Sequence, residues 1–153
     1  MPNTYSQIYL HTVFAVQNRL SLINDKWRDE LYKYITGIIQ NRGHKMLRIG
    51  GMPDHVHIFF NMRPVESLSV LMRDVKSGSS SWINERNFTR GRFVWQEGFS
   101  AFSYSISQID DVIKYIANQA EHHKGVDMVE EYKKLLEKNG IPYDERYIFK
   151  SVE

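Results

Sequence analysis

The sequence predicts an α+β fold in which an antiparallel sheet has helices packed on one face, with a further helix near the C-terminus. Two observations indicate this fold. Short runs rich in Val, Ile, Phe, Tyr and Thr, typical of strands, alternate with longer segments whose apolar residues recur every three or four positions, which is typical of amphipathic helices. In addition, a Gly-Gly and Pro-Asp turn at residues 50–54 joins two of the strands as a hairpin.

Composition narrows the classes of protein to consider. The 153 residues fit one domain, which we expect to span residues 1–153, and an apolar share of 42% with 13% aromatics excludes a disordered chain. The absence of cysteine argues against thiolate metal sites and a disulfide-stapled secreted domain. The first residues lack the pattern of a signal peptide, and no apolar run is long enough to span a bilayer, so we expect a cytoplasmic protein without membrane contact. The net charge of +2 permits a polyanionic partner.

The first half of the chain predicts a strand, a helix and a hairpin. Residues 5–17 suit a strand, and a helix begins near Asp25 and ends at Gly43, where glycine favours a helix end. Residues 44–49 and the apolar run that ends at Phe60 are the two strands of the hairpin. A strand, a helix and a hairpin in this order are the first half of a ferredoxin-like sandwich.

The second half repeats this pattern and adds two helices. Apolar residues recur at helical spacing in three segments, and two Ser-initiated sequences typical of capping boxes precede the second of these helices. The predicted elements are a helix at 68–83, a strand at 93–104 that is interrupted at residues 97–98, a helix from Ser105 or Ser107 to Gly125, and a helix from Val129 to Gly140.

Basic and aromatic residues gather between the second helix and the fourth strand, at residues 87–95, and two more cations lie on the preceding helix. This stretch has two interpretations. It is either a loop with solvated arginines, or a groove that pairs cations for phosphates with rings for base stacking. On the second interpretation, the candidate DNA-binding residues are Arg73, Lys76, Arg90 and Arg92.

Two histidines share one face of the strand that follows the glycine turn. Side chains alternate along a strand, so His55 and His57 point one way while Val56 and its apolar neighbours point the other. Such a pair can hold a metal ion or a phosphate, although histidines are also commonly half-buried without such a role. Asp54 is the only close carboxylate in the sequence, and it points to the opposite face if the strand is already regular at that residue.

A tyrosine and a glutamine form a second pair on the third helix. Tyr115 and Gln119 are four residues apart and therefore share a helix face, which His122 extends. If this helix packs near the histidine strand, two imidazoles and an amide oxygen form a three-ligand metal site, with Tyr115 placed to attack a phosphate. A phenol with a pKa near 10 needs an electrophile polarised by a metal. Because ligand imidazoles must be unprotonated, we expect activity to fall as pH drops through about 6.5.

These motifs together resemble the HUH single-tyrosine transposases of the insertion-sequence-200/605 type. The resemblance rests on His55-Val56-His57 after a Met-Pro-Asp turn, on the stretch at residues 95–98, and on Tyr115-x-x-x-Gln119, and it extends over almost the whole chain. It implies a ferredoxin-like fold, a homodimer, single-stranded DNA with a hairpin at the element ends as substrate, and a divalent ion, Mg²⁺ or Mn²⁺. It also implies that Tyr115 attacks a DNA phosphodiester and keeps a 5′-phosphotyrosine link, while His55, His57 and Gln119 hold the ion.

Three alternatives remain at this level. A catalytically silent nucleic-acid-binding module would leave the histidines structural, and a metal-dependent phosphoesterase using water would need further carboxylate ligands near them. A domesticated relative that processes chromosomal repeats would keep the transposase chemistry. For the resembled enzyme we expect a dimer joined edge to edge through residues 93–104, in which the Tyr115 helix of one chain completes the histidine site of the other.

Overall fold

Four antiparallel strands form the sheet at the centre of the structure, a computed structural model that describes residues 4–119 and 127–143. The strand order is β2-β3-β1-β4, which is the order of a ferredoxin-like sandwich and confirms the predicted α+β class. The strands are β1 (Tyr9–Ala15), β2 (Lys45–Met52), β3 (His55–Asn61) and β4 (Ser100–Tyr104). The helices are α1 (Arg28–Asn41), α2 (Leu68–Glu85), α3 (Ile109–Ala117) and α5 (Met128–Lys138), with short 3-10 turns η1 (Gln17–Arg19) and η2 (Ile106–Gln108).

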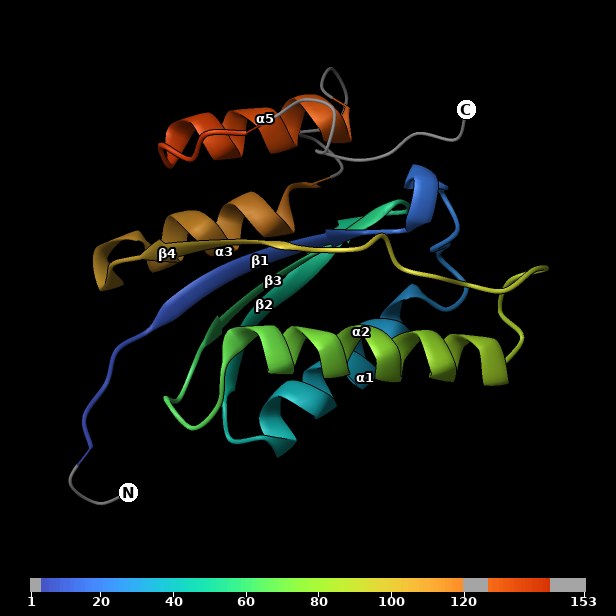
Figure 1. The fold of residues 1–153 in the computed structure, drawn as a ribbon, viewed down its shortest axis with the longest axis horizontal. Coiled ribbons are helices and arrows are strands. Elements are labelled where there is room, and N and C mark those ends of the chain that lie inside the picture. The colour runs from blue at the N-terminus through green and yellow to red at the C-terminus, as the bar shows by residue number, and fades with distance from the viewer. Residues whose placement is uncertain (1–3, 120–126, 144–153) are drawn as a thin grey trace.

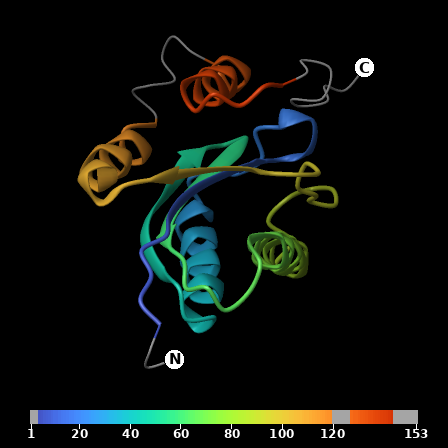
Figure 2. The same cartoon turned by 60° about the vertical axis from the view of Figure 1, so that its left-hand side comes forward.

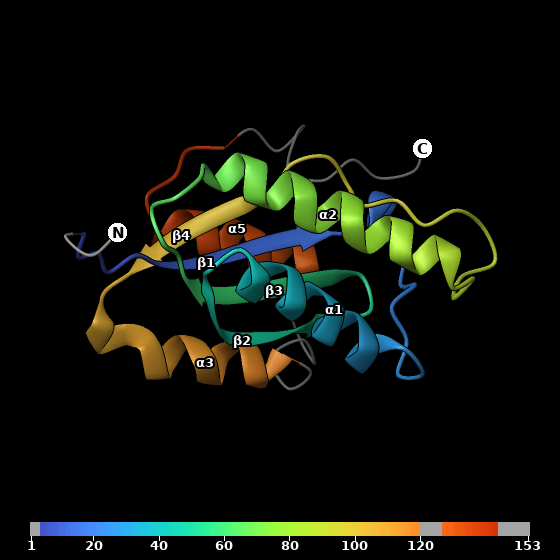
Figure 3. The same cartoon turned by 90° about the horizontal axis from the view of Figure 1, so that it is seen from below.

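Helices cover both faces of this sheet. Figure 1 shows α1 and α2 on one side and α3 and α5 on the other, and the rotated view in Figure 2 shows the same separation. The prediction that helices pack on one face of the sheet therefore holds for α1 and α2, which lie side by side over the same face (Figure 3). The third helix lies with the C-terminal helix on the opposite face.

Strand alternation decides which side chains each face receives. On β3, Val56, Ile58 and Phe60 enter the main apolar core beneath α1 and α2. The intervening residues point to the other face, where Phe59 packs against α3 and the two histidines lie beside it. The α1–α2 face thus holds the larger apolar core, whereas the α3–α5 face combines two smaller apolar clusters with the polar side chains of the histidine pair.

The predicted fourth strand is regular only over its second half. Trp95 makes an isolated antiparallel bridge with Val16, and regular pairing with β1 resumes at Ser100. Between them Gly98 has a φ of 84°, which confirms the interruption predicted at residues 97–98. The predicted single helix from Ser105 or Ser107 to Gly125 was wrong in its extent, because α3 ends at Ala117 and Asn118 has a non-helical φ of −100° and ψ of 24°. Residues 120–126, with His122, and the aromatic tail beyond residue 143 lie outside the described residues.

In the described parts of the chain, no helix is both long enough and apolar enough to cross a membrane.

A glycine lets α3 approach the sheet closely. A Cβ atom built on Gly50, in β2, would lie 2.9 Å from Ile116 Cγ2 and 3.0 Å from the Ile116 carbonyl oxygen on α3. Any larger residue at this position therefore pushes on the helix backbone at Ile116. Tyr115 is the neighbour of Ile116 on α3, and Gln119 follows three residues after Ile116, beyond the end of α3.

We predict that Gly50→Ala lowers the free energy of unfolding by about 1–3 kcal/mol, the usual cost of overpacking, because neither the strand nor the helix backbone can yield freely. Gly37→Ala is the matched control, since Gly37 lies within α1 with nothing within 4 Å of the added Cβ. This control substitution raises the free energy of unfolding by about 0.5–1 kcal/mol through helix propensity. Urea unfolding measures both values, and a Gly50→Ala protein as stable as the parent would contradict the close approach.

Candidate active site and metal centre

A buried carboxylate lies between the two histidines of β3. The carboxylate belongs to Glu131 on α5, whose Oε1 atom is 3.0 Å from His57 Nε2 and 3.2 Å from His55 Nε2. Both histidine side chains are fully buried, and Glu131 is 2% exposed. One ligand atom from each of the three residues lies within 4.8 Å of the other two, so the group has the spacing of a metal site.

Gln119, two residues beyond the end of α3, completes this cluster. Its Oε1 atom is 3.2 Å from His55 Nε2, and its Nε2 group donates a hydrogen bond of 3.2 Å to Glu131 Oε2. The structure therefore brings together the three predicted metal ligands and adds a fourth candidate ligand, the carboxylate of Glu131, which the prediction lacked.

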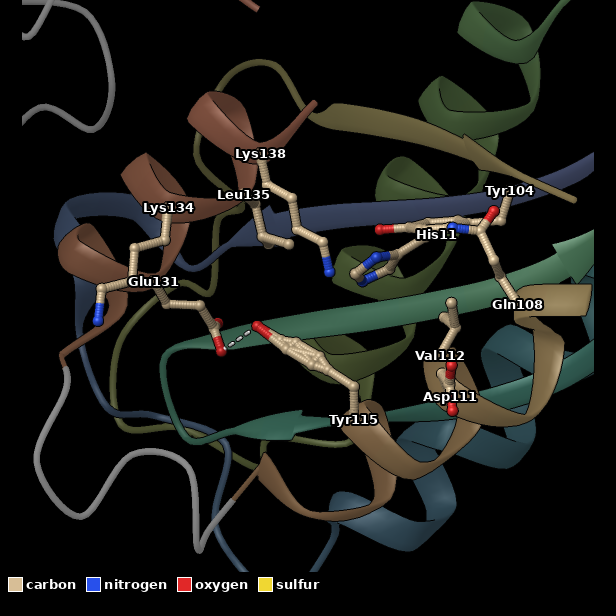
Figure 4. Close-up of a pocket in the computed structure, with 10 residues that line it drawn as sticks. All are labelled: His11, Tyr104, Gln108, Asp111, Val112, Tyr115, Glu131, Lys134, Leu135 and Lys138. Atoms are coloured by element: carbon tan, nitrogen blue, oxygen red, sulfur yellow. Dashed lines mark hydrogen bonds between the residues drawn. The ribbon is translucent and has the colours of Figure 1, made fainter. Parts of the chain in front are cut away.

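Tyr115 extends over the same cluster. Its hydroxyl donates to Glu131 Oε2 at 2.5 Å, the contact drawn as a dashed line in Figure 4. Its ring also lies edge-on to the ring of His57, with 5.7 Å between the centroids. The candidate nucleophile and the candidate metal ligands therefore share one carboxylate.

A second layer of residues orients the two imidazoles. Asp54 Oδ1 accepts a hydrogen bond from His55 Nδ1 at 2.7 Å, and His11 Nε2 is 2.7 Å from His57 Nδ1. These contacts engage both Nδ1 atoms, which leaves both Nε2 atoms facing Glu131. Partners of this kind fix the ring orientation of metal-binding histidines.

The Asp54 side chain lies on the same side as His55. Asp54 belongs to the turn before β3 and not to the regular strand, so alternation does not apply, and its carboxylate turns to His55. The opposite face was expected for Asp54 only if the strand were already regular there, and β3 begins one residue later, at His55. The expectation that Asp54 is the only close carboxylate was wrong, because Glu131 contacts both histidines.

The sequence carried a signal for Glu131 that motif spacing alone overlooks. Glu131 lies three residues after Met128 and four before Leu135, and all three are buried on the same stripe of α5. A carboxylate at a buried position of an amphipathic helix needs a partner, which makes it a candidate site residue. His11 lies on β1, next to β3, and no spacing pattern links it to the histidine motif.

The carboxylates set the protonation of the cluster. Burial alone would lower the pKa of His55, but hydrogen bonds to Asp54 and Glu131 outweigh burial and raise this pKa to about 9. Burial alone would raise the pKa of Glu131, but hydrogen bonds from His55, His57 and Tyr115 hold it well below its usual range. Burial and the charge of Glu131 raise the pKa of Tyr115 well above its usual value. The metal-free site thus pairs a protonated His55 with an ionised Glu131 that accepts from a neutral tyrosine.

The donor set fits a divalent ion. Two imidazole nitrogens favour a first-row transition metal, whereas the oxygens of Glu131 and Gln119 add the ligands that Mg²⁺ and Mn²⁺ prefer. The four side chains converge in a buried place, and each imidazole has its own orienting partner.

One chain supplies every residue of this cluster. We expected the Tyr115 helix to complete the site of a partner chain, but α3 packs on β2 of its own sheet, where Gly50 permits the close approach. In this structure the site is therefore assembled in cis.

The candidate DNA-binding residues lie apart from this cluster, on or beside α2. Arg73 is exposed and pairs with Asp74, and Arg90 and Arg92 are exposed on the loop after α2. Lys76 donates to the carbonyl oxygens of Gln96 and Gly98, at 2.6 and 2.8 Å, and thereby ties this loop to α2.

The rings of the basic stretch do not form a stacking surface. Phe93 and Trp95 are 1% and 6% exposed and pack edge to face within the main core, where the Trp95 indole N–H donates to Ser79. The interpretation of these two rings as base-stacking platforms was wrong, because both are buried in the main core.

Comparisons with known proteins agree with this geometry. A family model described as "Transposase IS200 like" matches residues 4–119, which confirms the resemblance found in the sequence. A crystal structure of a candidate transposase from Deinococcus radiodurans R1 is similar with a TM-score of 0.60 and 18% identity, over 76% of this chain and 94% of that one. A REP-associated tyrosine transposase bound to a REP hairpin is similar with a TM-score of 0.61 and 14% identity, over 99% of this chain and 92% of that one. At these identities the two structures show a shared fold, and no sequence among the curated proteins matches the chain.

We predict that manganese binding strengthens as pH rises and levels off near pH 9. His55 must lose its proton to bind a metal, and its pKa in the metal-free protein is about 9, higher than the value of 6.5 assumed from sequence. Below pH 9 the ion therefore displaces a proton, and the apparent affinity rises about tenfold per pH unit. Calorimetric titration with Mn²⁺ from pH 6.5 to 9.5 measures this slope. Asp54→Asn removes the negative charge beside His55, so the plateau of the affinity for Mn²⁺ shifts to lower pH. In the parent protein, an affinity for Mn²⁺ that is already constant above pH 7 would contradict the raised pKa of His55.

Proposed function

The chain belongs to the IS200-like transposase family, and from this premise we propose that it cleaves and rejoins single-stranded DNA through a covalent link to Tyr115, with the aid of a divalent ion. The observation that carries the proposal is the contact of the Tyr115 hydroxyl with Glu131, the same carboxylate that lies between His55 and His57. We take residues 1–153 as one HUH transposase domain.

In the proposed cleavage step, the Tyr115 hydroxyl oxygen attacks the phosphorus of a DNA phosphodiester. The bond between that phosphorus and the DNA 3′-oxygen breaks, which leaves a 5′-phosphotyrosine and, after the departing oxygen takes a proton from solvent, a free 3′-hydroxyl. Glu131 Oε2 accepts the hydrogen bond of the tyrosine hydroxyl and orients its oxygen, and the hydroxyl proton passes to solvent as that oxygen attacks. Rejoining reverses these bond changes with the 3′-hydroxyl of another DNA end as nucleophile.

We propose that His55, His57, Gln119 and Glu131 hold the ion, which is Mg²⁺ or Mn²⁺. When bound, such an ion polarises a phosphate oxygen and offsets the charge that develops during attack. The residues of the chain keep their own tasks: Asp54 and His11 hold the imidazoles in place, and Glu131 holds the tyrosine hydroxyl against the cluster.

We further propose that the substrate is single-stranded DNA with a hairpin, in line with the REP hairpin bound by one structural neighbour. Arg73, Arg90 and Arg92 would contact its phosphates, and Lys76 would add a charge while it ties down the loop. For a homodimer, the described sheet offers the outer edge of β4 as a pairing surface, which would leave each chain's own site intact.

Glu131 also supports a second candidate function, a metal-dependent phosphoesterase that uses water. That enzyme needs a further carboxylate near the histidines, and the structure supplies one. The two candidates differ in the fate of the DNA: a water-using enzyme releases both products, whereas the transposase keeps one strand on Tyr115. A domesticated relative acting on chromosomal repeats would also keep the covalent link, and a silent binding module would cleave nothing.

We predict that the parent protein forms a denaturation-resistant adduct with single-stranded DNA from the end of its own element, in the presence of Mn²⁺, and that Tyr115→Phe forms none. The substitution removes only the hydroxyl, so the fold and DNA binding remain. The adduct is followed with 5′- and 3′-labelled DNA on denaturing gels and mapped by mass spectrometry. Tyr104→Phe serves as the control and keeps the adduct. DNA cleavage without any adduct would favour the water-using enzyme, and an adduct on another tyrosine would contradict the assignment of Tyr115 as the nucleophile.

We predict that a mixture of Tyr115→Phe and His57→Ala proteins stays inactive after subunit exchange. On our proposal each site is built from one chain, in line with the contacts of Tyr115, Glu131 and His57 within this chain, so every site in a mixed dimer lacks either the nucleophile or an imidazole. Adduct formation after co-refolding of the two variants is the measurement. Recovery of up to half of the parent activity would show that the sites are shared between chains.

A further inference from the structure

A cavity of about 320 Å³ opens beside Tyr115, between α3 and α5. Figure 4 shows the residues that line it: His11 and Tyr104 lie on the sheet, Asp111 and Val112 on α3, and Leu135 and Lys138 on α5. The cavity also reaches Tyr115 and Glu131, so whatever fills it lies next to the proposed nucleophile. Its volume is at the small end of ligand pockets, about 300–1,000 Å³, and suits a single nucleotide.

Rings and apolar side chains form the body of this pocket. The Tyr104 and His11 rings lie 6.2 Å apart and tilted by 36°, and the Val112 and Leu135 side chains border the space on the two helices. An unstacked nucleobase has two apolar faces and is commonly held by aromatic side chains of this kind. In the 87–95 stretch, Phe93 and Trp95 are buried in the main core and the half-buried Phe88 stacks on Trp27, whereas Tyr104 is half-exposed beside the proposed nucleophile.

The two walls differ in charge. Lys134 and Lys138 are exposed on the α5 side, one turn apart, and Figure 4 shows Lys138 extending toward His11 and the pocket. Asp111 is exposed on the α3 side. This polarity orients a nucleotide, because a phosphate is drawn to the lysine side and repelled by Asp111, whereas the amino groups of a base can donate to the Asp111 carboxylate.

We propose that this pocket binds the nucleobase directly next to the phosphate that Tyr115 attacks, with the base on Tyr104 and the flanking phosphate on Lys138. This proposal rests on the proposed function and adds a binding site to it. A bound adjacent base fixes the scissile phosphate beside the tyrosine hydroxyl. Because the reacting atoms are then held in position, base binding accelerates the cleavage step.

The test uses the parent protein and oligonucleotides from the end of its own element, after the cleaved bond has been mapped by adduct formation. Each of the three nucleotides on either side of that bond is replaced in turn by an abasic site. At subsaturating DNA, we expect an abasic site at one position next to the cleaved phosphate to slow adduct formation by about 5- to 150-fold, the range for loss of one stacked base. The other five positions should change the rate by much less.

Two pairs of variants assign the effect to the pocket. Tyr104→Leu keeps an apolar side chain but removes the ring, so it slows cleavage of intact DNA by a similar factor and adds little on DNA that is already abasic at that position. Tyr9→Leu is the matched control, since Tyr9 is another half-buried tyrosine on the same face and does not line the pocket. Lys138→Ala makes the slope of log affinity for DNA against log salt concentration less steep by about 0.7, which is the contribution of one phosphate on single-stranded DNA. The control Lys114→Ala, outside the pocket, leaves this slope unchanged.

The outcomes separate this proposal from the function on which it rests. Adduct formation that is equally fast on all six abasic substrates, or a Tyr104→Leu effect that multiplies fully with the abasic effect, would overturn the pocket proposal and leave the transposase function standing. A parent protein that forms no adduct with intact DNA would overturn both.

Discussion

The geometry of the site depends on the contacts that converge on the carboxylate of Glu131. This carboxylate receives a hydrogen bond from Tyr115 on α3 and contacts both histidines of β3, while its own backbone lies on α5. An ionised carboxylate that is 2% exposed is stable only if its charge is matched, and here a protonated His55 and two hydrogen-bond donors match it. Removal of one partner from a buried charge pair commonly costs about 3–5 kcal/mol, so the cluster holds α3 and α5 to the sheet as well as preparing the chemistry.

The two faces of the sheet receive different side chains from β3. Alternation along β3 sends Val56, Ile58 and Phe60 into the core under α1 and α2, and sends His55 and His57 to the other face. The glycine at position 50 then lets α3 pack so closely on β2 that Tyr115 and Gln119 reach the histidines of the same chain. The candidate nucleophile and the candidate metal ligands, which come from separate elements, are thereby held in one place by ordinary packing.

Much of this arrangement could be predicted from the sequence, because it follows from periodicity. The period of two along β3 predicted that the histidines share a face, and the period of 3.6 along α3 predicted that Tyr115 and Gln119 do. The docking of α3 could not be predicted in the same way, since it depends on a contact between Gly50 and Ile116, which are far apart in the sequence. Glu131 and His11 were missed for a related reason: each joins the site through tertiary packing and has no fixed spacing from the histidine motif. The rings at Phe93 and Trp95 were misread because composition alone does not tell a ring on the surface from a ring in the core.

The central claim is that one chain builds a metal site from His55, His57 and Glu131 around its own nucleophile. A crystal structure of the protein soaked with Mn²⁺, with anomalous scattering recorded at the manganese edge, tests it most directly. The account predicts one strong anomalous peak within bonding distance of His55 Nε2, His57 Nε2 and a Glu131 oxygen, with Tyr115 of the same chain beside it. A peak held by other residues, or a histidine pair completed by the tyrosine helix of a neighbouring chain, would contradict it.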